Sequence, residues 1–162
     1  MSVVALPIRS GSCSWTVTNA QGALKVEFRG NLDESVQLEP LGAQLKGRVV
    51  FHLQAIDRIN SCGVREWVNL VRDLRGVQLV FTHCSPAVVA QLNMVSNFGG
   101  GAKVESVYAP YLCEICGAGE DLLVDVREVK LQHKLPPKAC GRCQRPMVFD
   151  ELFDRYFGFA ID

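Results

Sequence analysis

Residues 48–74, RVVFHLQAIDRINSCGVREWVNLVRDL, decide the fold of this chain. Residues 48–54, RVVFHLQ, are rich in β-branched and aromatic side chains, which favours a buried strand. From residue 64 onward, apolar side chains recur at the intervals i, i+3, i+4, i+7 and i+10, the spacing of a helix with one buried face. These residues are Val64, Trp67, Val68, Val71 and Leu74. A strand followed by an amphipathic helix predicts a domain of the α/β class.

The alternation of strands and helices continues on both sides of this stretch. Residues 15–18 and 24–29 flank a turn and predict an antiparallel hairpin. The other expected elements are a short helix from Asp33 or Ser35 to about residue 45, a strand at 77–82, a helix from Pro86 to the glycines at 99–101, an extended segment at 103–112 and a strand at 122–129. This order predicts a mixed β-sheet with helices packed over it.

The composition of the chain limits its partners. It has 162 residues, 48% of them hydrophobic, with 17 Lys and Arg against 17 Asp and Glu and a pI near 6.8. This balance argues against a general binder of nucleic acids or anionic membranes. No apolar run reaches the roughly 20 residues of a membrane span, and the first residues lack the long apolar run of a secretory signal. We therefore expect a cytoplasmic protein with no membrane span.

Two C-x-x-C pairs near the C-terminus carry the sharpest chemical signal. Cys113 and Cys116 form the first pair, Cys140 and Cys143 form the second, and 23 residues separate the two pairs. Two residues between cysteines allow one tight turn to direct both sulfurs at the same ion. The spacing therefore predicts a single site with four sulfur ligands.

Four thiolates in tetrahedral geometry suit Zn²⁺, and a closed Cys₄ site is structural rather than catalytic. The alternatives are two disulfides, a redox pair, or iron in the same geometry. Cytosolic thiols stay reduced, so paired C-x-x-C motifs favour a metal there. We expect Gly117 and Gly141 to give the two turns their backbone freedom. A ribbon of this size needs its metal to fold, so two domains are expected, an α/β domain at 1–110 and a zinc ribbon with an aromatic C-terminal segment at 111–162.

Two short motifs in the α/β domain point to a known family. They are Leu32-Asp33-Glu34, after an early strand, and Ile59-Asn60-Ser61-Cys62-Gly63-Val64, at the start of the helix. With these motifs, residues 10–110 resemble a STAS domain, the fold of bacterial anti-sigma-factor antagonists and of the cytoplasmic part of sulfate transporters. The family shows Gly-x-Leu-Asp at the first place and Asp-Ser-Ser/Thr-Gly-Leu at the second. Here Asn60 replaces the aspartate, and Cys62 replaces the second serine or threonine.

The resemblance implies a bacterial signalling module that binds other proteins. Its partner-binding loop would comprise Asp33, Asn60, Ser61, Cys62 and Gly63. Ser61 matches the serine that a partner serine kinase phosphorylates in that family. The residues alone leave two interpretations of this loop open. Asn60 or Ser61 caps the helix, or a phosphate on Ser61 acts as a switch that the positive end of the helix tolerates.

The last part of the chain is dense in aromatic residues. Phe149, Leu152, Phe153, Tyr156 and Phe157 fit one face of a helix. Two interpretations remain open for this face. It packs over the ribbon or the first domain, or it is a docking helix whose anchors are Phe149, Phe153, Tyr156 and Phe157.

The sequence favours a non-catalytic regulatory or scaffolding module that binds protein partners. We expect no enzymatic activity, because the chain lacks an open metal site, a carboxylate pair and a phosphate-binding glycine loop. The alternative is a nucleic-acid-binding regulator that acts through the ribbon, where five basic residues cluster. These are Lys130, Lys134, Lys138, Arg142 and Arg145. The near-neutral charge of the ribbon makes nucleic acid the weaker candidate, and the partner, the pathway and the oligomeric state stay open.

Overall fold

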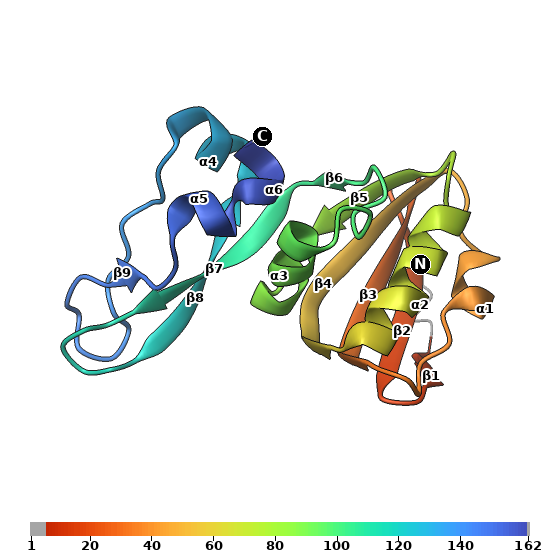
Figure 1. Cartoon of the computed structure of the whole chain (residues 1–162), viewed down its shortest axis with the longest axis horizontal. Coiled ribbons are helices and arrows are strands. Elements are labelled where there is room, and N and C mark those ends of the chain that lie inside the picture. The colour runs from red at the N-terminus through yellow and green to blue at the C-terminus, as the bar shows by residue number, and fades with distance from the viewer. Residues whose placement is uncertain (1–5, 162) are drawn as a thin grey trace.

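The chain folds around two β-sheets that lie end to end (Figure 1). The computed structural model describes residues 6–161. The first sheet has six strands in the order of the sequence: β1 (Ile8–Ser10), β2 (Cys13–Ala20), β3 (Ala23–Leu32), β4 (Arg48–Ile59), β5 (Gln78–Thr82) and β6 (Lys103–Val104). The pairs β1–β2 and β2–β3 are antiparallel, whereas β3, β4, β5 and β6 run parallel. The predicted mixed sheet of the α/β class is therefore confirmed.

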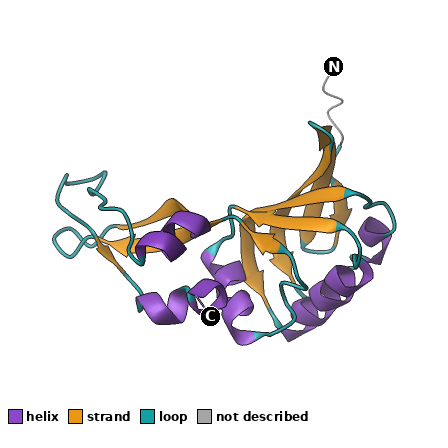
Figure 2. Ribbon diagram, turned by 90° about the horizontal axis from the view of Figure 1, so that it is seen from above, coloured by secondary structure: helices purple, strands orange, loops and turns teal. Residues whose placement is uncertain are grey.

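Three helices cover one face of the first sheet. They are α1 (Glu39–Gly42), α2 (Ser61–Asp73) and α3 (Pro86–Met94). Each helix connects two neighbouring parallel strands, and right-handed crossovers that advance in one direction place their helices on the same face. Figure 2 shows the result, with the helices along one face of the first sheet and none of the helices of residues 6–161 over its other face.

The core between this sheet and its helices is built from aromatic rings. Trp67 on α2 is fully buried, and four phenylalanine rings lie 5.4 to 5.7 Å from it, centroid to centroid. These rings belong to Phe28, Phe51, Phe81 and Phe98. The indole nitrogen of Trp67 donates to the carbonyl of Phe98 at 3.1 Å, so its polar group is satisfied inside the core. Of the predicted apolar face of α2, Trp67, Val71 and Leu74 are buried. Val64 and Val68 are only half-buried, and Leu70, which the prediction left out, is buried.

The second sheet has three antiparallel strands with β7 (Ser106–Leu112) in the centre. Its neighbours are β8 (Gly119–Asp125) and β9 (Val148–Phe149). Three short helices complete this part: α4 (Val126–Gln132), α5 (Phe153–Tyr156) and α6 (Gly158–Ile161). We call residues 106–161 the ribbon. Figure 1 shows the ribbon extending away from the first sheet, with the β7–β8 turn at the far end.

The expected extended segment at 103–112 divides between the two sheets at Glu105. Residues 103 and 104 form β6 in the first sheet, and β7 begins at Ser106 in the second sheet. The amide of Glu105 donates to the carbonyl of Phe81, and its carbonyl accepts from the amide of Val126. One residue thus anchors the junction to both parts of the molecule.

Two predicted elements differ from the structure because side chains bind the backbone locally. The strand expected at 122–129 ends at Asp125, whose carboxylate accepts from the amides of Arg127 at 2.8 Å and Glu128 at 3.2 Å and starts α4. The helix expected from Asp33 or Ser35 begins only at Glu39. There, the hydroxyl and amide of Ser35 bind the carboxylate of Asp33 instead of starting a helix.

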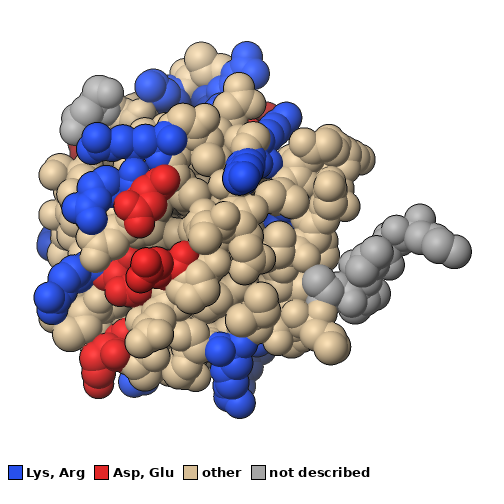
Figure 3. Space-filling view, turned by 90° about the vertical axis from the view of Figure 1, so that its right-hand side faces the viewer, with Lys and Arg blue, Asp and Glu red and all other residues tan. Residues whose placement is uncertain are grey.

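The surface carries charges of both signs. Figure 3 shows Lys and Arg side chains lying beside Asp and Glu at the end of the molecule formed by the first sheet and α1. No single sign covers this end, which agrees with the equal totals of acidic and basic residues. Within residues 6–161, none of the helices combines the length and the apolar character needed to cross a bilayer.

Candidate metal centre and the loop before helix α2

The four cysteines of the C-x-x-C pairs meet at the far end of the ribbon. All four Sγ atoms lie within 4.8 Å of one another. Cys113 Sγ is 3.5 Å from Cys143 Sγ, and Cys116 Sγ is 3.6 Å from Cys140 Sγ. A tetrahedral ion with bonds of about 2.3 Å to sulfur would separate its ligands by about 3.8 Å. The cysteines are free thiols rather than disulfides, so this cluster can hold a metal ion.

The first pair of cysteines lies in the turn that follows β7. The amide of Cys113 donates to the carbonyl of Ala118, and the amide of Gly117 donates to the carbonyl of Cys113, both at 2.8 Å. Gly117 has a φ angle of 76°, a conformation that suits glycine. Its predicted role in the turn is therefore confirmed.

The second pair forms an equivalent turn from different residues. The amide of Cys140 donates to the carbonyl of Arg145 at 2.8 Å, and the amide of Gln144 donates to the carbonyl of Cys140 at 2.9 Å. The left-handed residue here is Gln144, with a φ angle of 66°. The prediction that Gly141 gives this turn its backbone freedom is wrong. The amide of Arg142 lies 3.4 Å from the sulfur of Cys140, an orientation that stabilises a thiolate.

Gly141 serves a different purpose, because its amide reaches across to β8. It donates to a carboxylate oxygen of Glu120 at 2.8 Å, and the other oxygen of Glu120 binds Lys138 Nζ at 2.6 Å. The hydrogen bond from Lys138, followed by that from Gly141, lowers the pKa of Glu120. This bridge ties the second cysteine turn to the first hairpin. It also occupies Lys138, one of the five clustered basic residues of the nucleic-acid alternative.

The electrostatics of the cluster favour the charged form of one cysteine. The backbone amides of Cys116 and Ile115 point at Cys113 Sγ and lower the pKa of this thiol to about 7. Thiolates are the form of cysteine that binds metals. The set of four sulfur donors within 4.8 Å of one another fits a tetrahedral ion such as Zn²⁺, or iron in the same geometry.

The two family-like motifs of the first domain come together at the start of α2. β3 and β4 pair in parallel up to Leu32 and Ile59, and the amide of Asn60 then donates to the carbonyl of Leu32 at 3.1 Å. A β-carbon on Gly63 would lie 2.0 Å from this same carbonyl oxygen. Glycine is therefore required at 63, because α2 begins in direct contact with the backbone of β3. The close neighbour of Gly63 is the backbone of Leu32.

Asn60 is the centre of this loop. Its side-chain oxygen accepts from the amide of Gly63 at 2.9 Å and caps α2. Its side-chain nitrogen donates to Glu34 at 2.8 Å. An aspartate at 60 would keep the cap but would face Glu34 with a second negative charge. The neutral amide of Asn60 is thus matched to the carboxylate of Glu34.

The remaining residues of the predicted loop lie at different depths. Ser61 is exposed at the first residue of α2, and Cys62 is half-buried. Asp33 turns away from Ser61 toward the hydroxyls of Ser12 and Ser35, whose hydrogen bonds lower the pKa of its carboxyl. The structure therefore brings Glu34, rather than Asp33, into contact with Asn60.

The aromatic tail, residues 147–161, does not form one continuous helix. Phe149 lies on β9 and pairs with Tyr111 of β7, whereas Phe153 and Tyr156 lie on α5. Tyr156 is 8% exposed and Phe157 is fully buried, while Phe149 and Phe153 are half-buried. Burial of these side chains favours packing over a docking role, because an anchor must be accessible to its partner. The single helical face predicted for this segment is wrong.

The tail fastens the ribbon to α3 of the first domain. The side-chain nitrogen of Asn93 donates to the carbonyl of Tyr156, and its oxygen accepts from the amide of Phe159, both at 2.8 Å. The hydroxyl of Tyr156 donates to the carbonyl of Tyr108 on β7. No sequence pattern indicated this contact of Asn93, because its partners lie more than 60 residues away in the chain.

Comparison with known proteins finds no protein-family profile and no curated protein that matches the chain.

Proposed function

We propose that this chain is a non-catalytic regulatory or scaffolding module that binds a protein partner through the loop at the start of α2. The first domain is STAS-like in this proposal, and Zn²⁺ is a structural ion in the ribbon. The protein acts in the cytoplasm, and the partner is a serine kinase or another component of a signalling or assembly complex.

One observation carries the proposal, namely the meeting of two separate motifs around Asn60. Residues 32–34 and 59–64 are distant in sequence, yet Asn60 contacts Leu32 and Glu34 while it caps α2. The cap and the close contact of Gly63 with Leu32 hold the loop in one conformation. A preorganised loop loses little conformational entropy when a partner binds. Ser61, at its edge, is exposed to such a partner.

The cysteine cluster supports a structural role for the metal. Four thiolates complete a tetrahedral shell and leave no position for a substrate or a water molecule. The ion would join the turn after β7 to the turn at 140–143. The described hydrogen bonds between these parts run from the amide of Gly141 to Glu120, from the hydroxyl of Tyr111 to the carbonyl of Pro136, and between β7 and β9. Folding of the far end of the ribbon is therefore expected to depend on metal binding.

Phosphorylation of Ser61 would change the loop without unfolding it. The N-terminus of α2 carries free amides and a partial positive charge, which stabilise an anion. The phosphate would also lie on the same side of the molecule as Glu34 and add about two negative charges to the surface that a partner covers. We therefore expect modification to weaken partner binding rather than stability.

The test is an affinity pull-down with the metal-loaded chain, followed by mass spectrometry of the bound proteins and of Ser61. Ser61→Asp is expected to reduce recovery of the identified partner and to change the free energy of unfolding by less than about 1 kcal/mol. Ser61→Ala should retain the partner. Ser96→Asp, at another exposed serine, is the matched control and should bind as the unmodified chain does. Equal recovery with Ser61→Asp and Ser96→Asp would show that the loop is only a helix cap.

A further inference from the structure

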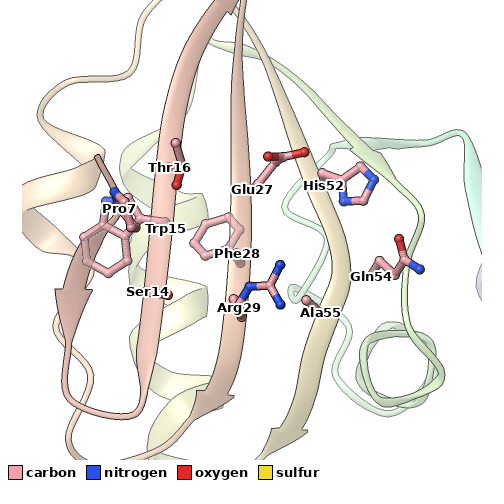
Figure 4. Close-up of a pocket in the computed structure, with 10 residues that line it drawn as sticks. All are labelled: Pro7, Ser14, Trp15, Thr16, Glu27, Phe28, Arg29, His52, Gln54 and Ala55. Carbon is pink, nitrogen blue, oxygen red and sulfur yellow. The ribbon is translucent and has the colours of Figure 1, made fainter. Parts of the chain in front are cut away.

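The face of the first sheet that lacks helices carries rows of polar side chains. The strand register places Thr16 beside Glu27 and Glu27 beside His52, and the next row places Ser14 beside Arg29. These residues and Gln54 line a cavity of about 720 Å³, seen in Figure 4. This volume lies within the range of roughly 300–1,000 Å³ that is usual for small-molecule sites.

The charges around this cavity do not cancel. Lys25 Nζ binds a carboxylate oxygen of Glu27 at 2.7 Å, so the acid in the cavity already has a cation. This hydrogen bond is the main cause of the lowered pKa of Glu27. Arg29 has no carboxylate within 4.0 Å among the residues that the structure describes. The cavity therefore holds one guanidinium in excess, with its full set of donors available to a ligand.

The other side chains of the cavity are neutral hydrogen-bonding groups. Burial, followed by the nearby His83 and Lys25, lowers the pKa of His52, so its imidazole is neutral near pH 7. Ser14, Thr16 and Gln54 add hydroxyl and amide groups from β2 and β4. One unpaired guanidinium, beside the Lys25–Glu27 ion pair and neutral hydrogen-bonding groups, is an arrangement that can recognise an oxyanion attached to a polar body.

The polarity of the face argues against a second sheet or a second copy as its occupant. Sheet-on-sheet packing requires apolar inner faces, and it would bury Arg29 and Gln54 without partners at a high cost. A small ligand that brings its own negative charge satisfies Arg29 instead.

We propose that this cavity binds a small organic anion with a carboxylate or phosphate group, and that Arg29 is the residue that holds the anionic group. Ser14, Thr16, His52 and Gln54 bind the polar body of the ligand. This cavity is separate from the loop at the start of α2, so the result of a ligand test at the cavity does not bear on the proposal for the loop.

The experiment is an NMR titration of the ¹⁵N-labelled, metal-loaded full chain at low salt. The probes are inorganic phosphate, glycerol phosphate and succinate, each raised to millimolar concentration. We expect saturable shifts at the amides of residues 14–16, 27–29 and 52–55 and at the side-chain Nε–H of Arg29. Saturation by phosphates alone would identify a phosphate ligand, and saturation by succinate alone would identify a carboxylate ligand.

Arg29→Gln should weaken the binding of the effective probe about tenfold or more, because the charge-assisted hydrogen bonds are lost. Arg29→Lys should have an intermediate effect, since it keeps the charge but loses the paired donors. Arg48→Gln is the matched control. Arg48 lies on β4, on the same face as His52 and Gln54, but outside the cavity, so this variant should bind like the unmodified chain. The proposal is overturned if no probe gives saturable shifts, or if Arg29→Gln and Arg48→Gln weaken binding equally.

Discussion

The two parts of this molecule are held together in different ways. The first domain surrounds Trp67 with phenylalanine rings, and both tryptophans of the chain lie in its core. The ribbon has no comparable aromatic centre at its far end, where Cys113 and Cys140 are the fully buried side chains near the cluster. At its near end, the ribbon is fastened to α3 by the tail. A hydrophobic core can stabilise the first domain alone, whereas we expect folding of the ribbon to depend on an ion at the cysteine cluster and on contact with α3.

Removal of the metal should have the largest effect, because it should destabilise the ribbon and leave the first domain folded. We expect about one Zn²⁺ per chain, since structural Zn²⁺ contributes about 10–16 kcal/mol of apparent binding free energy to folding. Cys140→Ser, or chelation, should raise amide exchange across residues 106–150. Tryptophan fluorescence should change little, because both indoles report on the first domain. Cys62→Ser, outside the cluster, is the control that should keep its metal. Elemental analysis without metal, together with disulfides, would contradict this prediction.

A β-carbon at Gly63 should damage the first domain and spare the ribbon. The new methyl group of Gly63→Ala would lie 2.0 Å from the carbonyl oxygen of Leu32, a backbone atom that has no room to move. We expect a loss of about 3 kcal/mol or more in the free energy of unfolding, at the upper end of overpacking effects. Urea unfolding followed by tryptophan fluorescence measures it.

Gly99→Ala is the matched control for this substitution. Its β-carbon would lie 3.4 Å from Leu92 Cδ2, an ordinary contact. The explanation from close packing fails if the two alanine variants unfold at the same urea concentration.

The sequence could predict features that depend on local spacing. The intervals of Trp67, Val71 and Leu74 identified the buried face of α2, and the two C-x-x-C pairs identified the sulfur cluster. In both cases the residues that act together lie a few positions apart in the chain, so their spacing can be recognised in the sequence.

Features that depend on distant partners or on a single side chain could not be predicted. The segment 122–129 alternates like a strand, and only the capping hydrogen bonds of Asp125 convert its second half into α4. The pair of Asn60 with Glu34 requires knowledge of the β3–β4 register. The left-handed conformation of Gln144 belongs to a residue type that gives little signal in a sequence.

The contact between the two parts can be loosened at Asn93. Asn93→Ala removes the hydrogen bonds to the carbonyl of Tyr156 and from the amide of Phe159. We expect a loss of about 0.5–1.5 kcal/mol, since the bond to the carbonyl of Tyr156 is only partly buried and the bond from the amide of Phe159 is exposed. Amide exchange at residues 153–161 should rise while exchange at the cysteine turns stays unchanged. Asn97→Ala, at an exposed position, is the control. Unchanged exchange in the tail would show that apolar packing alone fastens the ribbon.

The smallest expected effect is a pH dependence confined to the first domain. The rings of His52 and His83 stack with their centroids 4.3 Å apart on the face without helices. Burial lowers the pKa of both imidazoles below 6.5, and nearby Lys25 adds to this effect, whereas Glu27 opposes it at His52. The unfolded chain therefore binds more protons than the folded domain just below pH 6.5. Stability should be highest above this pH and should fall as the pH decreases through 6.5 toward the folded values.

The dependence of stability on pH can be measured by urea unfolding from about pH 8 to about pH 5, followed by tryptophan fluorescence. This probe does not report on the ribbon, whose thiolates also respond to acid. His52→Gln keeps a polar side chain of similar length and removes one titrating ring together with the stacked pair. The slope should then become shallower, because fewer protons distinguish the unfolded chain from the folded domain. His133→Gln, at an exposed histidine of the ribbon, is the matched control and should keep the full slope. Equal slopes in the two variants would place the pH dependence outside the imidazole stack.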